Sequence, residues 1–81
     1  MLSPEQRRDA EAEIDRSLNR ARESLRAIAS KSLSTSQQSA VAQIQSFIQQ
    51  AELARKTDLS SARSLAQKAD ILARDLAGNL R

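Results

Sequence analysis

Apolar residues recur with helical spacing in the first third of the chain, at intervals of four, three, four and three: Ile14, Leu18, Ala21, Leu25 and Ile28. The spacing places these side chains on one narrow stripe of an amphipathic helix. Ser3, Pro4 and Gln6 form a helix-start signal, because serine can cap, proline suits the first helical position and glutamine can close a capping box. The pattern predicts a first helix over residues 4–33, about 45 Å long, against about 30 Å for each of the two helices that follow. Either this helix bends or frays, or its amino-terminal end, residues 4 to about 12, overhangs the rest of the fold.

A long uncharged segment, residues 32–50, follows the first helix, although 28% of the chain is charged. Ser34 and Gln37 repeat the capping-box signal, and a second helix is predicted over residues 35–56. Its apolar positions form a wide band: Ala40, Val41, Ala42, Ile44, Phe47, Ile48, Ala51, Leu53 and Ala54. A helix that is contacted on two sides needs such a band, and glutamine near a buried face avoids the desolvation cost of a charge. We therefore expect this helix to lie between its two neighbours.

A third helix is predicted over residues 59–77, with Asp58 as its N-cap. Apolar side chains at intervals of three, four, three and four predict its buried stripe: Ala62, Leu65, Ala69, Leu72 and Leu76. Ile71 is expected to point away from that stripe, and Gly78 to end the helix in the left-handed conformation. Asp70 and Arg74 are spaced as an i,i+4 ion pair, which is typical of an exposed helix face.

The three helices predict an all-α fold, an antiparallel up-down-up three-helix bundle with a long first helix. Short connections make consecutive helices antiparallel neighbours, and 81 residues are enough for a single domain, residues 1–81. The composition agrees, because the chain has one Gly, one Pro and one aromatic residue and is rich in strong helix formers.

Charged residues are numerous but mixed in sign, with 13 basic and 10 acidic side chains giving a net charge of +3. Interspersed signs are typical of a solvated surface rather than of the one-sided basic patch of nucleic-acid-binding proteins. Four arginines of the first helix are nevertheless candidate anion contacts: Arg16, Arg20, Arg22 and Arg26. Acids stand within one turn of them, such as Glu13 beside Arg16. Weak electrostatic binding of RNA or of an anionic membrane surface is therefore the alternative function, and nucleic acid is not the expected partner.

Candidate chemistry is sparse. The chain has no Cys and no His, which removes disulfides, zinc fingers and imidazole catalysis. Glu5, Asp9 and Glu13 lie along one helix face, but side chains on one straight helix converge poorly on an ion, so they are interpreted as a solvated acidic face. A bundle this thin is also expected to lack a pocket of about 300 Å³. We predict no catalytic residue, cofactor or metal.

No targeting or membrane segment is recognisable. No stretch approaches the roughly 20 apolar residues of a membrane-spanning helix, and the amino-terminal residues lack the apolar core of a signal peptide. The compartment stays open between the cytoplasm, the default, and the periplasm, as a fragment of a larger bacterial envelope protein.

Residues 51–73 carry an alanine-rich hairpin pattern around Asp58, formed by Ala51, Ala54, Ala62, Ala66 and Ala69. This segment resembles the helix-turn-helix of tetratricopeptide repeats and related hairpins of small bacterial proteins. Thr57 replaces the turn glycine and Leu59 the aromatic residue, and no second copy follows at the 34-residue period. The resemblance implies a helical hairpin used in protein–protein scaffolding.

The sequence therefore predicts a non-enzymatic helical interaction or scaffolding module. Its mechanism is expected to be helix-on-helix docking through the first apolar stripe, within the chain or with a second copy. The docking residues are Ile14, Leu18, Leu25 and Ile28. The expected partner is a protein, either a second copy or another chain, and the expected state is a monomer or a homodimer.

Overall fold

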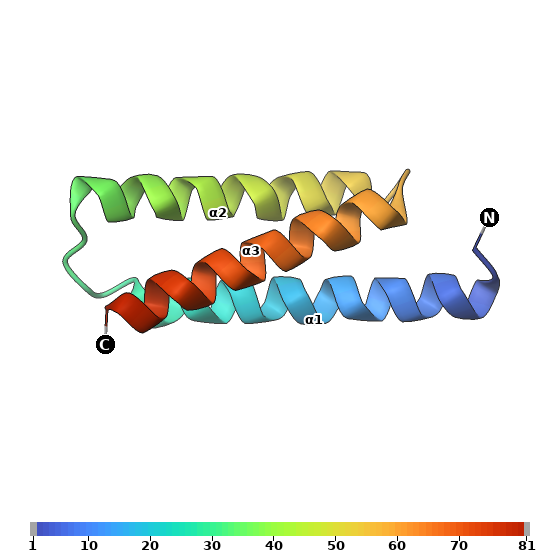
Figure 1. Ribbon diagram of the computed structural model, residues 1–81, viewed down its shortest axis with the longest axis horizontal. Helices are drawn as coiled ribbons and strands as arrows, with labels where there is room; N and C mark the ends of the chain where they lie inside the picture. The colour runs from blue at the N-terminus through green and yellow to red at the C-terminus, as the bar shows by residue number, and fades with distance from the viewer. Residues whose placement is uncertain (1, 81) are drawn as a thin grey trace.

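Three helices make up the computed structural model of the protein, which describes residues 2–80. They are α1 (Pro4–Ile28), α2 (Thr35–Ala54) and α3 (Leu59–Asn79). Each helix reverses direction relative to the one before it, which gives an elongated up-down-up bundle about 45 Å in its longest dimension (Figure 1). The predicted fold class is confirmed.

All three predicted helix starts are confirmed, because each rests on a local capping interaction. In the first capping box the backbone N–H of Gln6 donates to the Ser3 hydroxyl over 3.1 Å, and the Gln6 side chain accepts from the Ser3 N–H over 2.9 Å. Ser34 and Gln37 form the same box at the start of α2. Asp58 caps α3 by accepting from the backbone N–H of Ser61 over 3.2 Å.

The helix ends differ from the sequence prediction. α1 ends at Ile28 rather than near residue 33, because residues 29–33 form the reversal that leads into the extended backbone of the Ser34 cap. α2 ends at Ala54. Gly78 does not adopt the left-handed conformation, and α3 continues through it to Asn79. Leu80 packs partly against the core, and its carbonyl oxygen accepts from the Lys31 ammonium group over 2.9 Å, which keeps the last turn helical.

The predicted central position of the uncharged helix is wrong. α3 packs along both α1 and α2, whereas α1 and α2 touch each other at only a few positions. Four alanines of α3 are completely buried: Ala62, Ala66, Ala69 and Ala73. Because alanine lets helix backbones approach closely, α3 can lie against two helices at once. Figure 1 shows α3 crossing obliquely between the other two.

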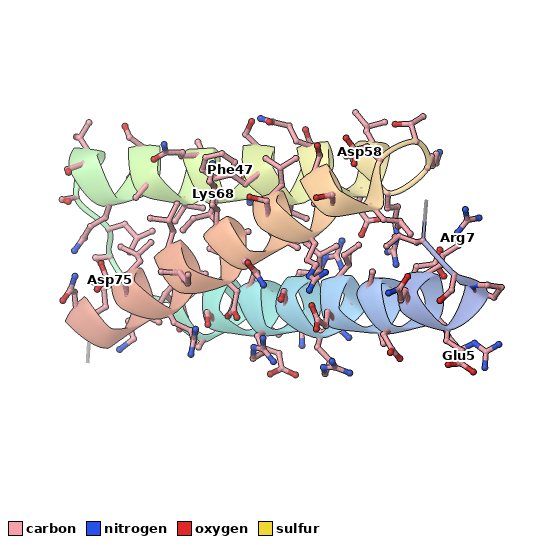
Figure 2. All side chains as sticks on the ribbon, turned by 45° about the vertical axis from the view of Figure 1, so that its right-hand side comes forward. Glu5, Arg7, Phe47, Asp58, Lys68 and Asp75 are labelled. Carbon is pink, nitrogen blue, oxygen red and sulfur yellow. The ribbon has the colours of Figure 1, made fainter. Side chains whose placement is uncertain are left out.

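The core side chains come mainly from α1 and from the alanine stripe of α3. The largest fully buried side chains are Ile14 and Leu18 of α1 and Ile44 of α2. α2 buries only three residues, Ile44, Ile48 and Ala51. Its Phe47 is partly buried, and the Lys68 ammonium group of α3 lies 6.0 Å from the ring centroid (Figure 2), close enough for a cation–π attraction.

Two leucines that the sequence predicts to be buried are exposed, Leu53 of α2 and Leu72 of α3. Leu53, assigned to the band of α2, is 68% exposed, and Ala42 is exposed as well. Leu72, assigned to the stripe of α3, is 37% exposed, because the alanine positions rather than the leucine positions form the centre of the buried face. Ile71 is 58% exposed, so the prediction that it points away from the core is confirmed.

Candidate functional site

Ion pairs join α1 to α3 along the side on which the two helices pack. The Glu13 carboxylate lies 2.7 Å from Nε of Arg63, and the Asp70 carboxylate accepts from Nε of Arg20 over 2.9 Å. The sequence interpretation had paired Glu13 with Arg16, within α1. The structure pairs it across the interface instead, because parallel helices in contact bring side chains of distant sequence within reach.

A second set of ion pairs joins α1 to α2, where the two helices have little apolar contact. Arg55 donates to the Asp15 carboxylate over 2.8 Å, and Arg22 donates to the Glu52 carboxylate over 3.1 Å. The hydrogen bond that Arg55 donates to Asp15 is the main cause that raises the pKa of the Arg55 guanidinium. Exposed ion pairs each contribute about 0.2–1 kcal/mol, so these pairs add little to the stability of the fold.

Asp70 is the largest departure from the sequence-based prediction. Its side chain is 4% exposed, although its spacing from Arg74 indicated an exposed pair. The Arg74 Nε atom lies 3.1 Å from Oδ1, but the geometry is not that of a hydrogen bond, and Oδ1 has no hydrogen-bond partner within the described residues. No sequence signal distinguishes this buried aspartate from an exposed one, because the i,i+4 spacing is the same in both cases.

The four residues predicted to dock a partner lie in the protein's own core. Ile14, Leu18 and Ile28 are 0%, 1% and 2% exposed, and Leu25 packs against the same cluster. Of the two docking modes considered, within the chain or with a second copy, these side chains serve the first. A partner that needs an exposed surface must bind elsewhere.

The four candidate anion contacts do not share one face. Arg16 and Arg20 line a groove between α1 and α3, whereas Arg22 and Arg26 line another between α1 and α2. Arg20 and Arg22 are held by Asp70 and Glu52. The structure therefore divides the arginine-rich helix into two separate basic sites.

The three acidic residues on one face of α1, Glu5, Asp9 and Glu13, differ in their surroundings. Glu13 is held by Arg63, while Glu5 and Asp9 are exposed on the amino-terminal end of α1. This end extends past the α2–α3 turn, so of the two alternatives, a bent or frayed helix or an overhang, the structure shows the overhang (Figure 1). No group of three or more acidic side chains in residues 2–80 is placed to hold a metal ion.

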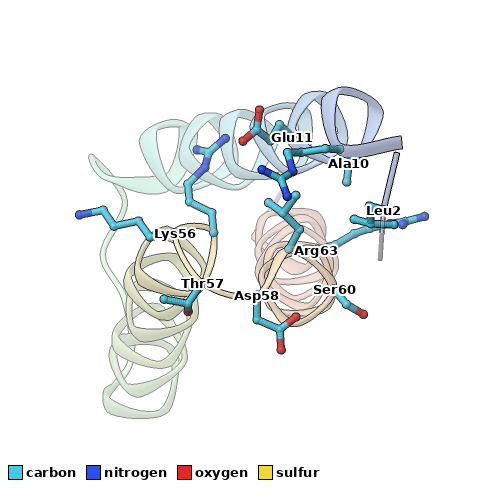
Figure 3. A pocket seen from close by; sticks show the side chains of 11 residues that line it. Leu2, Ala10, Glu11, Lys56, Thr57, Asp58, Ser60 and Arg63 are labelled. Carbon is cyan, nitrogen blue, oxygen red and sulfur yellow. The ribbon is translucent and has the colours of Figure 1, made fainter. Parts of the chain in front are cut away.

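An open groove of about 780 Å³ lies between the overhang and the α2–α3 turn (Figure 3). Leu2 and Ala10 line it from the α1 side, and Lys56, Thr57 and Asp58 line it from the turn. The expectation that so thin a bundle lacks any pocket of about 300 Å³ is wrong. Because α1 is longer than its neighbours, it creates concave surface at its end without widening the bundle.

The outer face of α2 is the part of the surface that differs most from the rest. Glu52 is the one charged residue of α2, and it points to Arg22 of α1. Five exposed residues spaced by three, four, three and four form what we call the neutral face: Ser39, Ala42, Ser46, Gln49 and Leu53. This is the spacing of a helix-packing seam, and it carries no charge.

The chain matches no known protein family, no curated protein and no solved structure. Within residues 2–80, no helix is both long enough and apolar enough to cross a membrane.

Proposed function

We propose that this protein is a non-enzymatic interaction module that associates with a second copy of itself through the neutral face of α2. The observation that carries the proposal is the segregation of charge. The charged side chains of α1 and α3 lie on other surfaces or are joined in ion pairs, whereas the outer face of α2 has none.

A second copy is the occupant that the neutral face favours, because a seam of small uncharged side chains is complementary to itself. Each chain carries a net charge of +3, which opposes the association of two copies, and this repulsion is smallest where they meet through uncharged surface. Two neutral faces related by a two-fold axis form a self-complementary interface. Small side chains at positions 42 and 46 allow close approach of the two helices, and Leu53, 68% exposed, supplies an apolar contact at each end.

The experiment is sedimentation from micromolar to millimolar concentration. It compares the wild-type chain with two variants that each carry one added positive charge. In an antiparallel pair centred on Ser46, the variant Ser46→Arg places two like charges face to face and is expected to give monomers at all concentrations. Ser64→Arg is the matched control, since Ser64 is an exposed serine of α3, outside the neutral face. The wild-type chain and the control are expected to dimerise as concentration rises.

Two results would overturn the proposal. One is a wild-type chain that stays monomeric over the whole range. The other is equal behaviour of the two arginine variants, which would show that added charge acts through the whole molecule and not through the neutral face.

The resemblance of residues 51–73 to a tetratricopeptide-type hairpin supports a scaffolding role in the same sense. In this hairpin α2 and α3 are held together through buried alanines, Ala51 from α2 and Ala62, Ala66 and Ala69 from α3. Such packing turns the outer surface of α2 away from the core and leaves it available to a partner.

A further inference from the structure

A second groove, of about 340 Å³, runs between α1 and α3 and is distinct from the neutral face. Three arginines line it, Arg16 and Arg20 from α1 and Arg74 from α3, and we call it the arginine groove. Asp70 and Ile71 of α3 also line it. Arg74 was not among the anion contacts predicted from the sequence, because only the packing of α3 against α1 brings it beside Arg20.

The buried carboxylate of Asp70 organises two of these arginines. Its Oδ2 accepts from Nε of Arg20 over 2.9 Å, and its Oδ1 lies 3.1 Å from Nε of Arg74. Both guanidinium groups therefore meet Asp70 at their Nε side, Arg20 through a hydrogen bond and Arg74 through an ion pair. Among residues 2–80, neither arginine donates a hydrogen bond through its terminal Nη nitrogens, and the two side chains are 50% and 60% exposed.

The groove has an excess of positive charge. The three arginines carry three positive charges and Asp70 carries one negative charge, which leaves +2. The remaining acid of the groove, Glu13, is 2.7 Å from Arg63 and is neutralised by it. A phosphate monoester carries a charge of about −1.5 to −2 at neutral pH and has three acceptor oxygens, and guanidinium groups bind such oxygens through two parallel hydrogen bonds.

We propose that the arginine groove binds the phosphate group of a small phosphomonoester. In this site Arg20 and Arg74 contact the phosphate oxygens through their Nη groups, and Arg16, one turn before Arg20 on α1, contributes a third positive charge. Asp70 is a positioning residue: it touches the arginines and not the ligand. Ile71, 58% exposed at the groove, offers an apolar contact to the organic part of the ester.

The test is calorimetric titration of the intact chain with phenyl phosphate and with phenyl sulfate, at fixed ionic strength and pH 7.5. The two probes have nearly the same shape, but the sulfate carries a single negative charge. We expect saturable binding of phenyl phosphate and weaker binding of phenyl sulfate. Inorganic phosphate is also expected to bind more weakly than phenyl phosphate, because it has no phenyl ring to contact Ile71. Equal affinity for the phosphate and sulfate esters, or no saturable binding, would overturn the proposal.

Variants separate a built site from general attraction to a basic protein. Arg74→Ala and Arg74→Lys are each expected to weaken phenyl phosphate binding about tenfold or more, since a charge-assisted pair of hydrogen bonds is lost in both. Arg8→Ala is the matched control: Arg8 is exposed on α1 outside the groove, and its removal is expected to leave the affinity unchanged. An equal loss in Arg8→Ala and Arg74→Ala would show diffuse electrostatics and contradict the site.

Asp70→Asn tests the positioning role. This change raises the local positive charge by one unit, so simple electrostatics predicts tighter binding. If Asp70 holds the arginines in place, binding weakens instead, which is the result we expect. Circular dichroism checks that each variant stays helical, and tighter binding by a folded Asp70→Asn protein would overturn the positioning role. Because these readouts do not depend on the neutral face, the site and the proposed self-association can fail separately.

Discussion

α2 and α3 are nearly equal in length, 20 and 21 residues, yet they occupy opposite roles in the fold. α2 has the longer run of uncharged sequence and the wider apolar band, but it buries three residues and leaves a whole face in solvent. α3 carries charges along its length and buries six residues, one of them Asp70. The charged helix is the one in the middle.

The size of the side chains explains this difference better than their polarity does. Four alanines at intervals of four, three and four let α3 approach both neighbours. Ile44 and Ile48 of α2 fill one interface well, and its glutamines and serines cannot form a second one. An apolar band therefore indicates burial, but close approach on two sides requires small residues at the crossing points.

The largest expected effect tests whether α2 is buried on one side only. Ile44→Ala is expected to lower the free energy of unfolding by about 2–5 kcal/mol, because it removes a fully buried side chain and leaves a cavity. Leu53→Ala, a similar truncation on the opposite face of α2, is expected to change it by less than about 0.5 kcal/mol. Urea denaturation of both variants, at a concentration at which the chain is monomeric, measures the difference. A larger loss in Leu53→Ala would mean that α2 is packed on its outer face.

The next effect tests the close packing of α3. Ala69→Leu is expected to destabilise the fold by about 1–3 kcal/mol, because a completely buried alanine has no room for a larger side chain. Ala27→Leu is the matched control at an exposed alanine of α1, outside the neutral face, and its effect is expected to stay within about 0.5 kcal/mol. The urea midpoints decide, and similar midpoints for the two variants would show that the helices of the bundle are not in close contact at Ala69.

The starts of the helices were predictable from the sequence because the decisive interactions are local. Ser3 and Gln6, or Ser34 and Gln37, lie three residues apart, and each pair is sufficient to begin a helix. The ends were less predictable. Glycine commonly ends a helix, and Gly78 therefore predicts a stop. Leu80 beyond it contacts the core, however, so tertiary packing extends the last turn.

The candidate sites were less predictable than the fold, because both depend on which helices pack together. Arg20 and Asp70 are 50 residues apart and meet only because α3 crosses α1. The sequence did identify the exceptional lack of charge around residues 32–50, but interpreted it as burial on two sides. A residue without charge can lie in a core or on a surface reserved for a partner, and the pattern alone does not separate these cases.

A smaller effect, of opposite sign to that of Ala69→Leu, is expected at the end of α3. Gly78→Ala is expected to raise the free energy of unfolding by about 0.5–1 kcal/mol, since Gly78 has helical backbone angles and alanine is the better helix former. No atom lies within 4 Å of an added Cβ there. Thermal unfolding followed by circular dichroism measures the gain. A loss of stability would show that Gly78 adopts a left-handed conformation in solution.

The smallest expected effect is a difference in acid sensitivity between the N-caps of α2 and α3. α2 begins with uncharged groups, Ser34 and Gln37, whereas α3 begins with the Asp58 carboxylate. Hydrogen bonds donated by the Ser61 hydroxyl and then by its backbone N–H lower the pKa of Asp58 below its ordinary value of 3.8. A lowered folded-state pKa stabilises the fold above the unfolded-state pKa, and this contribution disappears as the pH falls through the folded-state pKa. The cap of α3 is therefore sensitive to acid, and that of α2 is not.

Two substitutions that exchange serine and aspartate at the caps separate the contribution of Asp58 from the titration of the other acidic residues. Urea midpoints measured between pH 6 and pH 2 are expected to fall less steeply in Asp58→Ser than in the wild-type chain, because serine caps a helix without titrating. Ser34→Asp is expected to fall more steeply, since it gives α2 the acid-sensitive cap of α3. Both differences are expected to be small, because Asp58 is exposed and solvent screens its charge. Parallel pH profiles for all three chains would mean that the Ser61 hydrogen bonds do not favour the ionised form of Asp58 in solution.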